Sequence, residues 1–188
     1  MAHAEIRLSG FGGQGIILAG QIVGKAVSVF EDRNATLTQN YGPESRGGAC
    51  CAQVVMSDEE IAYPDIVEPD VFVAMSQEAY NKYYEDVKPN GLSIIDEDLV
   101  VPKAVKSGGR LLKMPATRLA DGMGKKFVAN IVMLGFLAAV SDTVSTDALK
   151  EAVKSSVPKG TEELNMKAFQ LGYDHGKRLP AATPAGKE

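Results

Sequence analysis

The sequence predicts an α/β fold of three layers with a mainly parallel, Rossmann-like sheet. Short apolar runs of strand length, such as residues 71–75, alternate along the chain with longer segments whose apolar residues recur at helical spacing. In addition, the first run, residues 6–8, leads through a glycine-rich loop into such a helical segment and then into another strand. This order is typical of a parallel β-α-β unit.

In the first third of the chain, a helix is expected after residue 15, because Ile16, Ala19, Val23 and Val27 fall on one face. A Thr-rich strand over residues 35–39 follows it. After a loop dense in Gly and Pro, residues 49–56 read as a strand, and residues 60–63 are expected to pair with it in antiparallel fashion.

In the remaining chain, the uninterrupted apolar run 71–75 is typical of a buried parallel strand. We expect a helix over 77–87, strands over 92–95 and 110–112, and a helix over 117–140 that breaks near 122–124. Two closing helices cover 145–157 and 161–173, the last with Leu164, Ala168 and Leu171 as its inner stripe. Residues 1–175 then form a single domain, and the polar residues 176–188 a flexible tail.

Composition excludes several classes of protein. With 20 Lys and Arg against 24 Asp and Glu, the net charge of −4 argues against a nucleic-acid-binding surface, which needs a basic excess. Two cysteines exclude a disulfide scaffold and a self-contained iron–sulfur or zinc site of four ligands. No apolar stretch reaches the ~20 residues of a membrane helix, and the first residues lack a signal-peptide layout. We expect a cytoplasmic protein that binds no metal and no membrane.

The loop after the first strand matches the pattern G-x-G-x-x-G through Gly10, Gly12 and Gly15. Its place between a strand and a helix suits anion binding at the helix N-terminus. A dinucleotide site also needs an acidic residue at the C-terminal end of the second strand. The nearest acids, Glu31 and Asp32, precede that strand and belong to the opposite sheet edge, which disfavours NAD and NADP. Close packing of helix on strand explains the glycines equally well.

A second glycine-rich loop follows the second strand, so both loops leave parallel strands at the carboxyl edge of the sheet, where such sheets bind ligands and partners. In it Arg46 would present a planar cation to a carboxylate, a phosphate or an acidic partner side chain. We assign none of the candidate residues a catalytic role. The candidate binding residues are Gly10, Gly12, Gly13, Gln14, Gly15, Asn40, Tyr41, Gly42, Pro43, Glu44, Ser45, Arg46, Gly47 and Gly48.

The two loops together resemble those of the gamma subunits of 2-oxoacid:ferredoxin oxidoreductases. The segment 39–46 is most similar to the branch that uses 2-oxoglutarate or branched-chain 2-oxoacids, and less similar to the indolepyruvate branch. The resemblance runs from residue 5 to residue 173. The similar segments are residues 10–15, 38–48, 57–61, 63–64, 69–71, 76–80, 130–135, 164–165 and 168–169.

The resemblance implies a subunit of an enzyme that converts a 2-oxoacid, coenzyme A and oxidised ferredoxin into an acyl-CoA, carbon dioxide and reduced ferredoxin. In that family thiamine diphosphate, Mg and iron–sulfur clusters are bound mainly by the other subunits. It implies alpha and beta partner subunits, in some enzymes with a ferredoxin-like delta subunit. The isolated chain is expected to be inactive, to bind none of these cofactors alone and to be capable of forming a homodimer. The resemblance favours 2-oxoglutarate as the 2-oxoacid, although the choice among 2-oxoacids stays open.

The alternative function left open by the residues is an independent Rossmann-like nucleotide-binding module or a small dehydrogenase. Other chemically capable residues are better explained by structure. Adjacent Cys50 and Cys51 should point to opposite faces of a strand and behave as small buried hydrophobes. Asn130, in an apolar helix, must find partners for its amide. The acidic run 96–98 reads as a solvated loop, and the tyrosines at 80, 83 and 84 as packing or a subunit interface.

Overall fold

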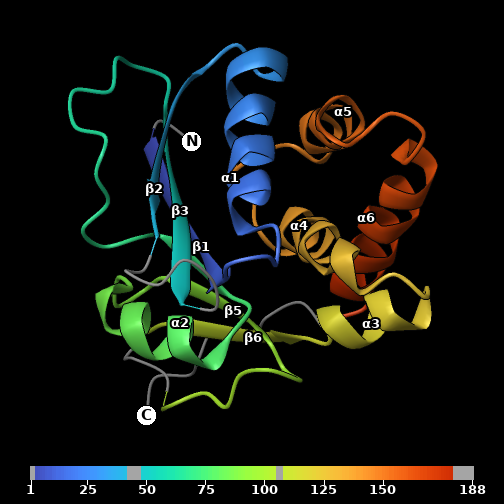
Figure 1. Cartoon of the computed structure of the whole chain (residues 1–188). Coiled ribbons are helices and arrows are strands. Elements are labelled where there is room, and N and C mark those ends of the chain that lie inside the picture. Colours follow the sequence, from blue (N-terminus) through green and yellow to red (C-terminus); the bar gives the residue numbers. More distant parts are fainter. Residues whose placement is uncertain (1–2, 42–47, 105–107, 180–188) are drawn as a thin grey trace.

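The computed structural model describes residues 3–41, 48–104 and 108–179. Its sheet has six strands in the order β2-β3-β1-β4-β5-β6. Helix α2 covers one face of this sheet, and α1, α4, α5 and α6 lie on the other, so the three-layer prediction is confirmed (Figure 1). The strands are β1 (His3–Phe11), β2 (Asn34–Asn40), β3 (Ala49–Ser57), β4 (Val71–Ala74), β5 (Leu92–Asp96) and β6 (Arg110–Met114); the helices are α1 (Ile16–Lys25), α2 (Gln77–Tyr83), α3 (Ala116–Gly122), α4 (Ala129–Val140), α5 (Thr146–Ser156) and α6 (Glu162–Lys177).

The sheet is mostly parallel, but its first two strands are not neighbours. β1 pairs with β4, β4 with β5 and β5 with β6 in parallel fashion. β3 lies between β1 and β2 and is antiparallel to both. The predicted β-α-β unit is therefore a split one, because β3 lies between its two strands. Because β1 and β2 are both antiparallel to β3, they still run in the same direction, and their carboxyl ends meet the same edge of the sheet.

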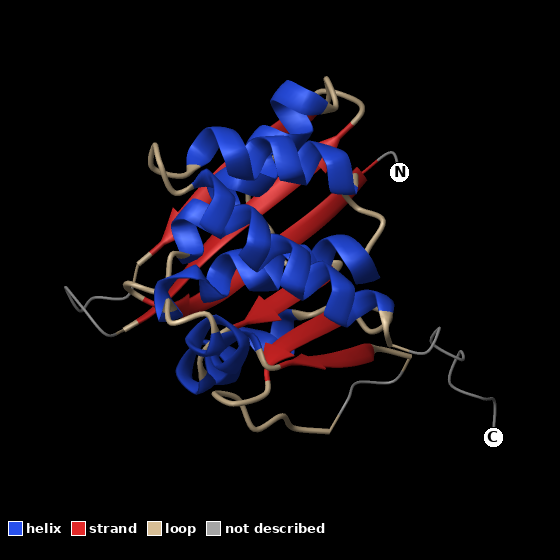
Figure 2. Ribbon diagram, turned by 90° about the vertical axis from the view of Figure 1, so that its right-hand side faces the viewer, coloured by secondary structure: helices blue, strands red, loops and turns tan. Residues whose placement is uncertain are grey.

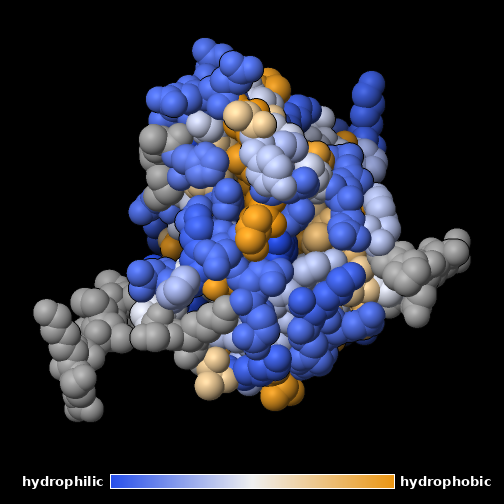
Figure 3. All heavy atoms as spheres, turned by 90° about the vertical axis from the view of Figure 1, so that its left-hand side faces the viewer, coloured by the Kyte–Doolittle hydropathy of each residue, from blue (hydrophilic) through white to orange (hydrophobic). Residues whose placement is uncertain are grey.

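The antiparallel partner of β3 was expected at residues 60–63, and this prediction is wrong. Both edges of β3 are already occupied by β1 and β2, so no backbone groups remain for a further strand. Residues 58–70 instead cross without helix or strand from the end of β3 to the start of β4. Figure 3 looks onto the side of the molecule that carries this segment and α2, and shows a mostly hydrophilic surface with small apolar patches.

Two cores flank the sheet, because successive side chains of each strand point to opposite faces. In β4, Val71 and Val73 enter the larger core beneath α1, α4, α5 and α6, the layer that faces the viewer in Figure 2. Phe72 enters the smaller core under α2, where it packs against Tyr80 and Tyr84. The tyrosines of α2 and of the turn that follows it are thus packing residues, one of the two roles expected of them.

Several helix boundaries differ from the predicted ones. α1 passes into a π-helical turn, Ala26–Phe30, and the predicted helix 117–140 is interrupted between α3 and α4, as expected from its glycines. The inner stripe of α6 is wrong in part: Ala168 is buried, but Leu164 and Leu171 are only half-buried, and Phe169 and Gly172 face the core instead. α6 extends to Lys177, so the first residues expected in the tail belong to a helix; residues 180–188 lie outside the described part. Among the described helices, none has the length and apolarity needed to cross a membrane.

Candidate functional site

The glycine loop joins the end of β1 to α1 at the carboxyl edge of the sheet. Gly13 and Gly15 have φ angles of 104° and 73°, in the left-handed region that side chains rarely adopt. A Cβ on Gly10 would overlap the side-chain amide of Gln14, so any side chain there would displace Gln14. The pattern of glycines therefore has a local structural cause at each of these positions, whichever function the loop serves.

The two glycine-rich loops were predicted to converge, and the described residues at their ends are in contact. The backbone N–H of Gly12 donates to the carbonyl oxygen of Gly48 at 3.4 Å. In the same region Tyr41, at the end of β2, is exposed and donates its hydroxyl to Gln39 at 2.8 Å. Asn40 ends β2 and is exposed. The other predicted residues of this loop, Gly42, Pro43, Glu44, Ser45, Arg46 and Gly47, lie outside the described residues.

Gln14 does not point its amide to a ligand but to its own loop and to the neighbouring strand. Its Oε1 accepts the backbone N–H of Phe11 at 2.6 Å, and its Nε2 donates to the carbonyl oxygen of Met75 at 2.8 Å. The backbone N–H of Gln14 also donates to the carbonyl of Phe11 at 3.2 Å. Gln14 is thus a structural member of the site, and its place among the ligand-binding candidates is not supported by these contacts.

Asn130, the buried amide predicted from the sequence, also contacts this loop. It is 3% exposed and donates its Nδ2 to the carbonyl oxygen of Gly15 at 3.1 Å. Its Oδ1 accepts the backbone N–H of Ile131 at 2.9 Å, which satisfies one of the N–H groups left free at the start of α4. Asn130 therefore joins the first turns of α4 and α1, the structural role we favoured.

A cavity of about 250 Å³ lies beside the glycine loop. Its walls come from three further segments at the same edge, which follow β5 and β6 and precede α4. Lys126 is the cation among the described residues that line it, and Phe127 is 65% exposed at its rim. The lining residues are Gly13, Gln14, Leu99, Thr117, Lys126, Phe127 and Ala129.

The side of the cavity that faces the glycine loop was not predicted from the sequence. Five of the exposed large apolar side chains lie on loops at the carboxyl edge, around the cavity and the two glycine loops. The sequence held one signal of this part of the site. Gly122 and Gly124 break the predicted helix that follows a parallel strand, and the residues after the break were therefore candidates for the same edge. The exposed apolar residues of the carboxyl edge are Phe11, Tyr41, Leu99, Val101 and Phe127.

The acidic run after β5 is not a solvated loop throughout, as had been expected. Asp96 is fully buried, and its Oδ2 accepts both the backbone N–H of Thr117 at 2.9 Å and its hydroxyl at 2.6 Å. Burial raises the pKa of Asp96, against the effect of these hydrogen bonds. Glu97 and Asp98 instead form ion pairs with Arg118 in α3. The run thus fixes the loop after β5 to α3 and shapes one wall of the cavity.

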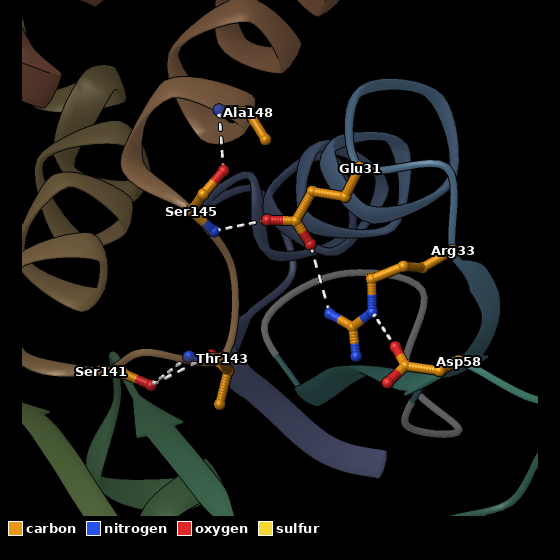
Figure 4. A network of polar contacts seen from close by, with 7 residues as sticks. All are labelled: Glu31, Arg33, Asp58, Ser141, Thr143, Ser145 and Ala148. Atoms are coloured by element: carbon orange, nitrogen blue, oxygen red, sulfur yellow. Dashed lines mark hydrogen bonds and ion pairs between the residues drawn. The ribbon is translucent and has the colours of Figure 1, made fainter. Parts of the chain in front are cut away.

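The larger cavity, about 420 Å³, lies at the opposite edge of the sheet. There Glu31 accepts the backbone N–H of Ser145 at 2.6 Å and pairs with Arg33 at 3.2 Å, and Arg33 pairs in turn with Asp58 at 2.6 Å (Figure 4). Ser145 also caps α5 by accepting the N–H of Ala148. Because these groups bind one another and join α1, β2, β3 and α5, we assign this network a structural role.

This network also bears on dinucleotide binding. Glu31, the nearest acid to the second strand, is held at the edge opposite the glycine loop, as expected. In addition, β3 separates β1 from β2, so a residue at the end of β2 is not beside the glycine loop as in a dinucleotide-binding unit. Both observations disfavour a NAD site.

The cysteines are confirmed as buried residues on opposite faces of β3. Cys50 lies in the larger core and Cys51 in the smaller one. Burial raises the pKa of both thiols, so thiolate is disfavoured at neutral pH. Within residues 3–41, 48–104 and 108–179, no three His, Cys, Asp or Glu side chains gather in a group that could hold a metal ion. The described side chains therefore do not fit an iron–sulfur cluster.

Three comparisons with known proteins point to the same family. The model of the family described as "Pyruvate ferredoxin/flavodoxin oxidoreductase" matches residues 5–175. A protein of Methanocaldococcus jannaschii, "2-oxoglutarate synthase subunit KorC", is 50% identical over 93% of this chain and 95% of its own length. A keto/oxoacid ferredoxin oxidoreductase gamma subunit from Geobacter sulfurreducens is 38% identical, with a TM-score of 0.84 over 94% of this chain and 97% of that one.

A second group of relatives is much longer. "Ketoisovalerate oxidoreductase subunit VorA" of Methanothermobacter thermautotrophicus is 32% identical over 92% of this chain but only 36% of its own length. The solved 2-oxoglutarate:ferredoxin oxidoreductase of Magnetococcus marinus matches 98% of this chain and 32% of its own, at 26% identity and a TM-score of 0.87. In these proteins the same domain is continuous with a longer polypeptide.

Proposed function

This chain belongs to the pyruvate ferredoxin/flavodoxin oxidoreductase family, and we propose that it is the gamma subunit of a 2-oxoglutarate:ferredoxin oxidoreductase. The observation that carries the proposal is the 50% identity to a 2-oxoglutarate synthase subunit along nearly the full length of both chains. Relatives named for ketoisovalerate and pyruvate match at 32% and 28% identity. The reaction is the CoA-dependent oxidative decarboxylation of 2-oxoglutarate, with ferredoxin as electron acceptor.

An iron–sulfur cluster does not fit the described residues of this chain. Two buried cysteines on opposite faces of a strand cannot ligate a cluster that usually requires four thiolates. We therefore assign the iron–sulfur clusters to the partner subunits. We propose the same for thiamine diphosphate and its Mg, as the resemblance to the family implies. No chemical step is assigned to a side chain of this subunit, and CoA enters as a co-substrate of the assembled enzyme.

The contribution of this chain would be a surface, and the carboxyl edge of the sheet is the best candidate. There the glycine loop, the cavity beside it and the exposed Phe11, Leu99, Val101 and Phe127 lie together. Exposed aromatic and aliphatic residues around a hollow are typical of protein–protein interfaces. We propose that this edge faces the thiamine-bearing subunit and helps to form the path for CoA or the 2-oxoacid. Whether Arg46 shares in it remains a prediction.

The longer relatives support a permanent partner. The matched domain is about one third of VorA but nearly the full length of the KorC relative. We propose that it packs against the rest of the enzyme in both cases. A stable interface buries about 1,200 Å² or more in total, with aromatic anchors near its centre. The alpha and beta subunits are the partners we propose, in addition to any ferredoxin-like delta subunit.

The test introduces a glutamate at exposed apolar positions, two of them at the carboxyl edge and one at the opposite edge of the sheet. Val101 and Val67 are 79% and 72% exposed, at the carboxyl edge and in the segment 58–70 respectively. Val101→Glu should weaken co-purification with the alpha and beta subunits, because a carboxylate would be buried in the interface. Phe127→Glu should do the same, and Val67→Glu should not. Wild-type assembly of both carboxyl-edge variants would overturn the proposed surface.

A further inference from the structure

Two buried or half-buried amides hold the glycine loop from inside the fold. Asn130 comes from α4, more than a hundred residues away in the chain, yet its Nδ2 donates to the carbonyl of Gly15 at 3.1 Å. The same carbonyl accepts the N–H of Ala19 at 2.9 Å, the first hydrogen bond of α1. A buried amide in an otherwise apolar helix is costly unless it is fully bonded, so this contact determines where α4 meets the loop.

Gln14 holds the other half of the loop. Its amide bonds both the N–H of Phe11, where β1 ends, and the carbonyl of Met75, just beyond β4. A residue of the same shape without an amide could make neither bond. Asn130 and Gln14 thus use their polar groups on the inner side of the loop, against strand and helix.

These contacts have a consequence for the backbone N–H groups of the loop. The N–H groups of Gly13 and Gly15 have no hydrogen-bond acceptor among the described residues. Gly13 is exposed and lines the 250 Å³ cavity, together with Phe127 and Lys126. Free N–H groups beside a helix N-terminus are complementary to a carbonyl, carboxylate or phosphate oxygen only while the conformation of the loop is held.

We infer that Gln14 and Asn130 are positioning residues, whose amides hold the glycine loop in the conformation that the partner subunit meets at the carboxyl edge. This inference rests on the proposed function of that edge. Neither amide touches the partner; each acts through the loop. The loop is then preformed, and the partner binds without first having to order it.

The test uses substitutions that remove the amide donor and keep the size of the side chain. Gln14→Met keeps the length of the side chain and removes both amide bonds without burying a charge. Asn130→Asp keeps the acceptor for Ile131 and replaces the donor to Gly15. The matched control is Asn165→Asp in α6. Asn165 is also a buried amide near the start of a helix, but its Nδ2 donates at 2.9 Å to the carbonyl of Thr161, the residue before α6.

In enzyme assembled from co-expressed alpha and beta subunits, Gln14→Met and Asn130→Asp should bind the partners about tenfold more weakly. KM for CoA should rise more than kcat falls. Hydrogen exchange at Phe11 should accelerate in Gln14→Met, because that N–H loses its acceptor. Asn165→Asp should lower the melting temperature while leaving partner affinity and KM as in the wild type.

The outcomes separate the inference from the proposed function. Wild-type affinity and KM in both amide variants, with weakened assembly in Phe127→Glu, would overturn the positioning role and leave the proposed surface intact. The positioning role would also be overturned if all three variants, Asn165→Asp included, lost partner affinity in proportion to the fall in their melting temperatures. Wild-type assembly of Phe127→Glu and Val101→Glu would remove the proposed surface itself.

Discussion

Gly135 of α4 and Gly172 of α6 face each other where the two helices cross, and each lies against the backbone of the other helix. A Cβ on Gly135 would overlap the carbonyl of Phe169, and a Cβ on Gly172 would overlap that of Val132. The helices can approach this closely only because both positions lack side chains. α4 in turn carries Asn130, so this crossing helps to fix the place of the candidate site.

We therefore expect Gly172→Ala to destabilise the protein by about 1–3 kcal/mol, because the added methyl must separate two packed helices. The control is Gly24→Ala in α1, where a Cβ would meet nothing within 4 Å. That change should be neutral or stabilise the fold by up to about 1 kcal/mol, since alanine loses less entropy on folding. Thermal unfolding of both variants measures the difference, and equal melting temperatures would contradict the packing argument.

A second prediction concerns Arg7, which is 4% exposed and joins three parts of the fold. It donates to Gln53 at 2.9 Å, to Asp86 at 2.6 Å and to the carbonyl of Ile66 at 2.8 Å. Arg7→Met leaves these acceptors without their donor and should lower the free energy of unfolding by about 1–3 kcal/mol.

The comparison for Arg7 is Arg118→Met, which removes an arginine whose side chain is 61% exposed. Exposed ion pairs contribute at most about 1 kcal/mol, so this variant should unfold close to wild type. Urea titrations of the two variants give both values. If Arg118→Met lowered the free energy of unfolding as much as Arg7→Met, burial of the guanidinium would not explain the contribution of Arg7.

The pH dependence of stability should report on Asp96. Burial raises the pKa of this carboxyl in the folded protein above its ordinary value. The folded state then binds more protons than the unfolded state in this range, so protonation favours folding. As the pH falls from 7 toward about 4, the ordinary pKa of Asp, the wild type should gain stability relative to Asp96→Asn, which cannot titrate there. A difference between the two proteins that does not vary with pH would contradict this.

The convergence of the two glycine loops could be predicted from the sequence, although the strand order behind it could not. Strand periodicity and turn residues identified β1, β2 and β3, but periodicity does not say which strands are neighbours. The insertion of β3 between β1 and β2 depends on pairing between distant residues, such as Gly10 with Cys50. The convergence survived because β1 and β2 keep the same direction, and Gly12 meets Gly48 there.

The parts of the site that could not be predicted are those held by long-range contacts. Asn130 was recognised as a buried amide in need of partners, but nothing near it in the chain indicates Gly15. The same holds for Asp96. It was predicted to lie in a solvated loop, but it is buried and its carboxylate is hydrogen-bonded to Thr117. Local pattern identifies the element on which such a residue lies, and only packing determines its partner.

The last prediction is that the isolated chain has no turnover. The cavity beside the glycine loop is lined by Lys126 and Thr117, with no acid–base pair among its described residues, and the Thr117 hydroxyl already donates to Asp96. The two buried thiols cannot carry electrons to ferredoxin through a cluster. The purified chain, given 2-oxoglutarate, CoA and a viologen dye, should therefore reduce the dye no faster than the enzyme-free mixture. Adding alpha and beta subunits should restore reduction, and those subunits without this chain should be slower than the full assembly. Dye reduction by the pure chain alone would contradict the assignment of every cofactor to its partners.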